Sequence, residues 1–376
     1  MTVRNLLVGL FGLALLTVLL IVVPGSGDDA ATPSIAPPAE QTVAGEATPP
    51  AGPAAEPEPG FQDADLEAGL VALCSSNAQA STEEESTQTY EEVMRPVLER
   101  LAASASGEHL LAASLLQTDP ASRFNLIERA VAAAPRDPLV LWSAVRMCSD
   151  SRYSWDCPLR EWEQRLIAVD GQNSESWVRV AANRYAAGEV SAALEAMRFA
   201  STSADSSIYW TEMIESIERA LRAAGDFSFA ERANSAIGFA ASQLPSYSGL
   251  TNMCREQSST SPDWADACLK YGELAEIRAD TVVGVSIALS VQGLVLEAVG
   301  ESARAAEVGE RRLARSQEFA SATPGMNATG ELMIQDPNLF YAYLAMIRSV
   351  GEVPAMSRVT ADIERLIRLR PELACR

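Results

Sequence analysis

Several residue types that carry protein chemistry are nearly missing from this sequence. Its 376 residues include a single histidine, His109, a single lysine, Lys270, and no Cys-x-x-Cys pair. Zinc sites need closely spaced cysteine and histidine ligands, and nucleophilic triads need a histidine beside a serine or cysteine. Because His109 lies between Glu108 and Leu110, we interpret it as an ordinary helix residue. The sequence therefore predicts no metal site and no catalytic triad.

Loops that bind phosphate and surfaces that bind nucleic acid are missing as well. The chain has no glycine-rich phosphate loop, and it carries 29 Lys and Arg against 50 Asp and Glu, a net charge of −21. Binding to a phosphate backbone depends on counterion release by basic side chains, which the acids outnumber here. We expect no nucleic-acid partner and no cofactor. Because no catalytic constellation is visible, we predict that the protein is not an enzyme.

A long apolar run stands near the N-terminus. Leu6 to Val23 is close to the lower length limit for a helix that spans a bilayer. Arg4 precedes the run and two aspartates follow it, which predicts a cytoplasmic N-terminus. We expect residues 1–26 to form a single-pass signal anchor in a bacterial inner membrane, with everything after residue 24 in the periplasm. The alternative is a cleaved signal peptide and a soluble periplasmic protein.

Proline is concentrated in the segment from Gly27 to Gly60, which lacks apolar periodicity. Such sequences favour extended conformations of about 3.1 Å per residue, so we predict a disordered linker over residues 27–60 that reaches at most roughly 100 Å. The remainder, residues 61–376, is rich in Ala, Leu and Glu and contains no convincing hairpin of alternating strands. The predicted fold class is all-α.

The run from Asn173 to Ala200 predicts two short helices folded back on each other. Ser174 is the expected N-cap, and apolar side chains recur at intervals that place them on one helix face. Gly188 ends the first helix, and Glu189 places negative charge at the start of the second, where the helix dipole favours it. Neither apolar stripe can bury itself alone. The stripes are Trp177, Val180, Ala181 and Tyr185, then Val190, Ala193, Leu194, Met197 and Ala200.

These residues resemble a tetratricopeptide repeat, a helical hairpin that stacks with its neighbours into a superhelix. Arg184 takes the place of the family's tyrosine, and Asp205 stands where a proline is usual. The resemblance implies tandem hairpins stacked as an α-solenoid over residues 61–376. The family's Trp, Leu-Gly, Tyr, Ala and Phe positions are met by Trp177, Val180-Ala181, Arg184, Ala193 and Met197.

Turns of glycine followed by an acid recur along the chain and extend this pattern. An alanine follows five residues after each of the first three glycines, where a small side chain lets paired helices approach closely. The wider spacing before the last turn coincides with Ser321 to Asp336, which we interpret as a loop. The glycines are Gly188, Gly225, Gly300 and Gly351.

The rest of the body also divides into predicted helices and loops. Ser75 to Ser86 is polar and predicts a loop. Thr281 to Val299 is the most apolar stretch of the body, but a bilayer would leave Gln292 and Glu297 unpaired, so we predict a buried helix. The last helix has an arginine-rich outer face and is expected to cap the array. The further predicted helices are Asp63 to Cys74, Thr89 to Ser104, His109 to Leu116, Ser122 to Ala134, Pro138 to Cys148, Pro158 to Val169 and Asp362 to Leu369.

Six cysteines on a chain expected outside the cytoplasm indicate disulfides. Cys148 and Cys157 stand at the end of one predicted helix and before the start of the next, so a bridge would clasp the two. Cys254 and Cys268 repeat this arrangement. The remaining pair, Cys74 and Cys375, either joins the two ends of the body or stays free.

We expect a membrane-tethered adaptor that binds an unknown protein or peptide on its concave face. In the tetratricopeptide family, ligands meet the inner face of the first helix of each hairpin. The resemblance points to Val178, Ala182 and Tyr185, with Arg179 beside them; Tyr185 packed between repeats is an equally good interpretation. The alternatives are an envelope enzyme or enzyme accessory with an unrecognised carboxylate site, acting on peptidoglycan or protein, and a subunit whose concave face is filled by its own chain or a second copy.

Overall fold

The computed structural model describes residues 61–79, 90–149 and 157–371, and the regular secondary structure of these ranges is entirely α-helical. Extended residues in the same ranges form only two isolated bridges, Asn173 with Asp205 and Ser206 with Ala279. The predicted all-α class is therefore confirmed. The predicted anchor, 1–26, and the predicted linker, 27–60, lie outside the described residues.

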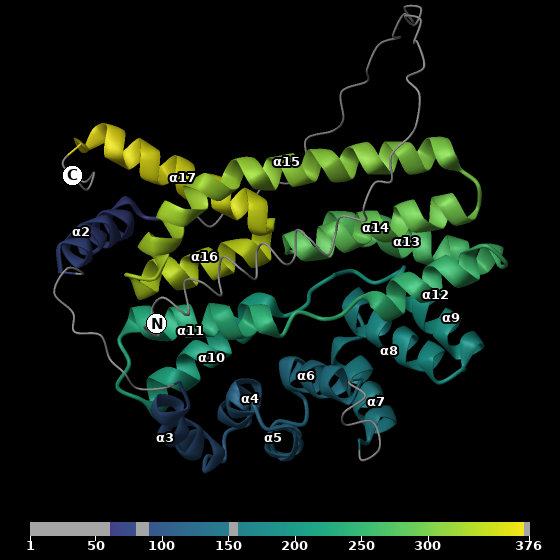
Figure 1. Ribbon diagram of the computed structural model, residues 1–376, viewed down its shortest axis with the longest axis horizontal. Coiled ribbons are helices and arrows are strands. Elements are labelled where there is room, and N and C mark those ends of the chain that lie inside the picture. The colour runs from purple at the N-terminus through teal and green to yellow at the C-terminus, as the bar shows by residue number, and fades with distance from the viewer. Residues whose placement is uncertain (1–60, 80–89, 150–156, 372–376) are drawn as a thin grey trace, which may run out of the picture.

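The first part of the body is a row of short helices along the lower edge of Figure 1. Two of these helices begin with a proline. The residue before each proline is an aspartate, Asp119 or Asp137, whose carboxylate accepts a backbone N–H of the first turn. Proline suits this position because its missing N–H would have no partner inside the helix. The row consists of α3 (Tyr90–Ala102), α4 (Gly107–Leu116), α5 (Pro120–Ala133), α6 (Pro138–Cys148), α7 (Leu159–Asp170), α8 (Ser174–Ala186) and α9 (Val190–Ala200).

The hairpin of α8 and α9 has the bounds that its sequence predicts. Its N-cap is Asn173 and not Ser174, because the Asn173 side chain accepts the backbone N–H of Glu175 at 3.1 Å. Gly188 turns the chain with a φ of +77°, a conformation that glycine adopts without steric cost. Gly300 and Gly351 also have positive φ, whereas Gly225 is extended, so the four turns are not equivalent.

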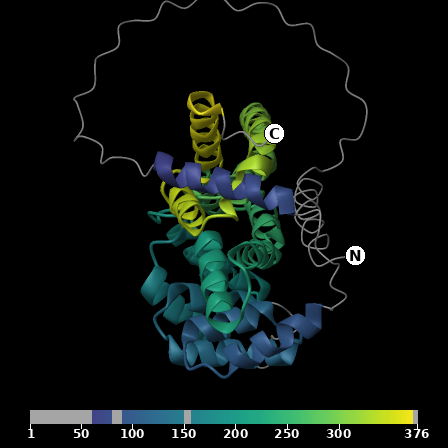
Figure 2. The ribbon, with the colours of Figure 1, turned by 90° about the vertical axis from the view of Figure 1, so that its left-hand side faces the viewer.

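The second part of the body lies above this row, as the side view in Figure 2 shows. Helices α10 and α11 lie between the row and the uppermost helices. The elements are α10 (Trp210–Ala224), α11 (Phe229–Ser242), α12 (Ser248–Ser258), α13 (Pro262–Arg278), α14 (Val282–Ala298), α15 (Ser302–Met333), α16 (Pro337–Val350), α17 (Glu352–Leu369) and, from the start of the body, α2 (Asp63–Gln79).

The order of packing changes after α9. From α3 to α9 each helix packs against the next one in the chain, and α6 also contacts α4 and α8. Later helices instead return to earlier ones: α10 packs on α3 and α4, α12 on α8, and α13 on α9. The N-terminal α2 packs against α15, α16 and α17. The body is thus not a single array in chain order, because its second part folds back over the first.

One continuous apolar core runs through both parts. It is built from leucines and from alanines such as Ala181, Ala193 and Ala200, which let helix backbones approach closely. A small separate cluster of Leu289, Leu296 and Val308 joins α14 to α15. Because hydrophobic burial scales with the apolar area removed from water, this shared core is what holds the later helices on the row.

Three predicted boundaries were wrong. Ser321 to Asp336 is not a loop: α15 continues to Met333, because the chain stays helical alongside α17, which packs on it. Helix α2 extends past Cys74 to Gln79, so Ser75 to Gln79 are helical, and the rest of the predicted loop lies outside the described residues. The last helix starts at Glu352 and not at Asp362.

The apolar stretch from Thr281 to Val299 folds as α14, packed against α12, α13 and α15. Gln292, one of the polar residues in question, donates to Glu276 at 2.8 Å and accepts from Arg311 at 2.7 Å. The prediction of a buried helix is confirmed. None of the helices in the described ranges is long and apolar enough to cross a bilayer.

Candidate functional site

The residues predicted to bind a ligand lie together along α8. Val178 is only 2% exposed, Arg179 is 9% exposed, and Ala182 and Tyr185 are partly buried. The structure thus brings the four predicted side chains onto one strip, as their spacing requires. We call Val178, Arg179, Ala182 and Tyr185 the inner strip.

Helix α12 and the residues beside it cover the inner strip. The Tyr185 hydroxyl donates to Glu256 at 2.7 Å and accepts from Gln257 at 2.9 Å. Tyr185 also meets the ring of Trp264 edge-on, with centroids 6.1 Å apart. At the other end of the strip, Arg179 donates to the carbonyl of Ser246 at 3.4 Å.

Glycine at position 249 allows this approach. A Cβ at Gly249 would lie 3.3 Å from the Cβ of Ala182, closer than most such contacts. The backbone of α12 therefore rests almost directly on α8. The surface that the tetratricopeptide resemblance assigns to a ligand is occupied by the chain itself.

A buried acid sits at the start of the same helix. Glu175 is 3% exposed, and its two carboxylate oxygens accept hydroxyls from Tyr271 at 2.7 Å and from Tyr247 at 3.0 Å. Burial raises the pKa of Glu175, against the lowering effect of the two tyrosines and of Arg179. Burial and the nearby Glu175 raise the pKa of both tyrosines well above the usual range. This cluster ties α8 to α13 and to the residue before α12.

Four segments meet next to this cluster. Asn173 accepts the N–H of Ser207 at 3.0 Å and donates to its carbonyl at 2.9 Å. The Ser207 hydroxyl donates to Asp280 at 3.1 Å, and the carbonyl of Asp280 accepts the N–H of Glu352 at 2.8 Å. Ser206 forms the bridge to Ala279. We call Asn173, Ser206, Ser207, Asp280 and Glu352 the polar junction.

The acids of the polar junction are held in an unusual electrostatic setting. Burial, followed by the negative charge of Glu212, raises the pKa of Asp280 to about 7, and Asp205 adds to this effect. Burial also raises the pKa of Glu352, whose carboxylate accepts the N–H of Val282 at 2.8 Å. Carboxyl groups with a raised pKa can serve as general acids, but they also occur in structural networks.

Two cysteine pairs clasp neighbouring helices. The Cα atoms of Cys148 and Cys157 lie 5.7 Å apart, and those of Cys254 and Cys268 lie 5.9 Å apart, with each pair at disulfide distance. These are the two pairs that the sequence predicts. The pairing of Cys74 and Cys375 falls on side chains outside the described part of the chain.

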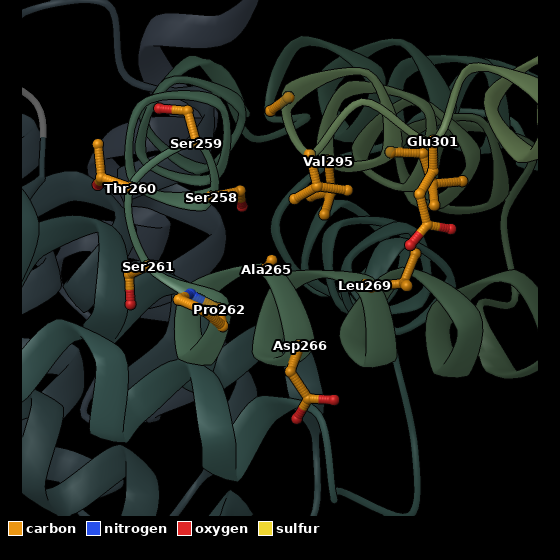
Figure 3. A pocket seen from close by; sticks show the side chains of 13 residues that line it. Ser258, Ser259, Thr260, Ser261, Pro262, Ala265, Asp266, Leu269, Val295 and Glu301 are labelled. Atoms are coloured by element: carbon orange, nitrogen blue, oxygen red, sulfur yellow. The ribbon is translucent and has the colours of Figure 1, made fainter.

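Two hollows lie on the surface of the described residues. One of about 590 Å³ lies between the α12–α13 turn and the end of α14, with Ser258 to Pro262 on one side and Val295 on the other (Figure 3). Its two acids are engaged, Asp266 with Lys270 at 2.8 Å and Glu301 with Arg304 at 2.6 Å. A second hollow of about 650 Å³ lies between α3 and α5.

The described ranges contain no group of three or more His, Cys, Asp or Glu side chains placed to hold a metal ion. His109 lies in the first turn of α4, with its ring Nδ1 3.0 Å from the Ser104 hydroxyl, and its backbone N–H donates to the Ser106 hydroxyl. It occupies the ordinary helix position that the sequence predicts.

Sequence reasoning missed the polar junction and the acid beneath it. Glu175 follows a helix start, where a carboxylate usually faces solvent, and its tyrosine partners lie 72 and 96 residues away. The one local signal is Asn173, a strong N-cap residue at the position that also bonds Ser207. No family model matches the chain, and no curated protein matches it at a significant level. The resemblance to tetratricopeptide repeats therefore stays a prediction.

Proposed function

We propose that the protein is a non-enzymatic, membrane-tethered helical-repeat adaptor that holds its own α12 on its inner face and meets a protein partner with its outer surface. The consecutive packing of α3 to α9, with α6 touching α4 and α8, supports the tetratricopeptide-like solenoid for this part of the chain. The tether at Leu6 to Val23 and the periplasmic location follow from the sequence. The paired cysteines support an oxidising compartment.

The observation that carries the proposal is the position of α12 along the inner strip. Leu250, Met253 and Cys254 of α12 are at most 2% exposed. Uncovering Leu250 and Met253 alone would cost about 3–6 kcal/mol, because each buried apolar side chain contributes about 1.5–3 kcal/mol. The Cys254–Cys268 pair also ties α12 to α13. A partner that replaced α12 would first have to overcome these contacts, so an outer binding surface is favoured.

Capture experiments distinguish the inner strip from the outer surface. Tagged full-length protein, purified from membranes after mild cross-linking, is compared with Tyr185→Ala and with Tyr185→Phe as the matched control. We expect one partner to co-purify in equal amounts with all three forms and their helicity to be unchanged. A partner captured by the wild type and by Tyr185→Phe but lost from Tyr185→Ala would place binding on the inner strip and contradict the proposal.

One observation favours the alternative of an envelope enzyme. Asp280 is desolvated, and Glu212 and Asp205 contribute negative charge beside it. A carboxyl group with a pKa of about 7 is partly protonated at neutral pH and can donate a proton to a leaving group. Incubation with peptidoglycan or with a protein substrate separates the two functions. The adaptor predicts no products, whereas turnover that Asp280→Asn abolishes would establish the enzyme.

A further inference from the structure

The carboxyl group of Asp280 lies where the two parts of the body are joined. Asp280 connects α13 to α14. Its backbone carbonyl accepts the N–H of Glu352, the first residue of α17, and its carboxyl group accepts the hydroxyl of Ser207 in the connection between α9 and α10. That connection is in turn bonded to Asn173 ahead of α8. Asp280 therefore lies in a hydrogen-bonded network that joins four segments of the chain.

The burial of this carboxyl group disfavours its ionised form, although the hydrogen bond from the Ser207 hydroxyl favours ionisation. Oδ2 accepts the Ser207 hydroxyl, whereas Oδ1 is buried without a hydrogen-bond partner. An ionised carboxylate has several lone pairs to satisfy, and leaving a charged oxygen buried and unbonded is costly. Protonation removes most of that cost because the group then carries no charge.

The charged and titratable groups around Asp280 are mainly acids. Asp205 faces it from the α9–α10 connection, Glu212 from α10 and Tyr247 from the segment before α12. Glu352 of α17 bonds its backbone, and the pKa of Glu352 is itself raised by burial. Among the described residues, the largest influences on the pKa of Asp280 therefore come from burial, acids and hydrogen bonds.

Three arginines of the surrounding helices have other partners or face solvent. Arg179 of α8 interacts with Glu175 and Tyr247. Arg348 of α16 pairs with Glu215 of α10 at 2.8 Å. Arg278, two residues before Asp280, is exposed on α13.

We propose that the polar junction is a proton-sensitive joint, closed when Asp280 carries a proton and loosened when Asp280 ionises. Ionisation places a new negative charge beside Glu212 and Asp205 and leaves Oδ1 as a buried anion, so conformations in which the junction opens and water reaches Asp280 are favoured. The connection between α9 and α10, which links the row to the second part of the body, is then held less firmly.

The sign of the pH dependence follows from proton binding. A closed junction binds the Asp280 proton more tightly than an open one, in which the pKa returns to the ordinary value near 4. Between about pH 4 and pH 7 the opening equilibrium rises by up to tenfold per pH unit, and above the folded pKa of about 7 it levels off. The junction is firmest in mild acid.

Hydrogen exchange measures this opening directly. The backbone amides of Glu352 and Ser207 report on the junction, and that of Ala193, bonded to Glu189 within the α8–α9 hairpin, is the internal reference. In the full-length wild type, protection factors corrected for intrinsic exchange should fall between pH 5 and pH 7 at Glu352 and Ser207 only. In Asp280→Asn, which has the same shape and no charge, the fall at both amides should be clearly smaller, and what remains is due to the buried carboxyl group of Glu352.

Controls keep the proposal falsifiable. Asp266→Asn, which removes an exposed acid of α13 paired with Lys270, should behave as the wild type. If Asp280→Asn does not fold, Glu212→Gln serves instead, and the midpoint of the protection change should move to lower pH. Carboxyl ¹³C titration of Asp280 gives a second measurement. A midpoint near pH 4, a flat protection profile in the wild type, or a fall that Asp280→Asn retains in full would overturn the proposal.

Discussion

The hydroxyl of Tyr271 on α13 donates a 2.7 Å hydrogen bond to Oε1 of Glu175 at the start of α8. Both residues are buried, and they are separated by 96 positions in the chain. This bond joins the second part of the body to the row, close to the strip where α12 lies on α8. The closure of the inner face therefore depends on polar contacts as well as on the apolar core.

Removing the Tyr271 hydroxyl should destabilise the protein measurably. Tyr271→Phe removes the hydroxyl that donates to one oxygen of the buried Glu175. We therefore expect a decrease of about 1–3 kcal/mol in the free energy of unfolding. Tyr185→Phe is the matched control, because its hydroxyl bonds Glu256 at a more exposed edge of the same contact. We expect less than about 1 kcal/mol for the control. Urea unfolding gives both values, and equal effects would contradict the importance of the buried bond.

Glycine has opposite effects at two positions near the start of α15. Gly300 has a φ of +82°, and Gly309 lies within the exposed helix with no atom within 4 Å of an added Cβ. Gly300→Ala should destabilise by about 1–2 kcal/mol because alanine is strained at positive φ. Gly309→Ala should stabilise by about 0.5–1 kcal/mol through helix propensity. Thermal unfolding of the two variants should shift the midpoint in opposite directions, and a shift of the same sign would be inconsistent with the turn.

The cysteine pairs can be mapped chemically. In protein unfolded by denaturant, alkylation without reduction should leave Cys148, Cys157, Cys254 and Cys268 unmodified, as read by peptide mass spectrometry, and alkylation after reduction should modify them. Replacing Cys254 and Cys268 together by alanine should cost about 3 kcal/mol, since a bridge across 14 residues constrains the unfolded chain. Full alkylation of these four residues in the unreduced protein would show that the pairs are not bonded.

Local patterns were enough to predict most helices and the cysteine pairs. The bounds of α6, α8 and α9 follow from apolar periodicity, proline at the first position and glycine at the turn. Each cysteine pair is close in sequence and lies at the junction of two helices, so helix prediction also predicted the pairing. These features depend on contacts within a few residues.

The arrangement of the second part could not be predicted in this way. Tyr185 has the same local sequence whether its hydroxyl meets a ligand or Glu256, 71 residues later. The resemblance to a repeat family indicated consecutive packing and could not indicate that α12 returns to α8. Asp280 follows an exposed helix end, and only its distant neighbours Ser207 and Glu352 make it part of a junction. Long-range contacts of this kind produce no periodic pattern in the sequence.

The position of α12 on the inner strip is tested most directly by a designed cross-link. In Ala182→Cys combined with Gly249→Cys, the Cβ atoms of the two cysteines would lie about as close as in a native disulfide, because a Cβ at position 249 would be 3.3 Å from the Cβ of residue 182. Each single variant is the control. We predict rapid formation of a peptide containing both new cysteines under mild oxidation, with unchanged helicity, in the double variant only. A folded double variant whose new thiols stay free would contradict the closure of the inner face by α12.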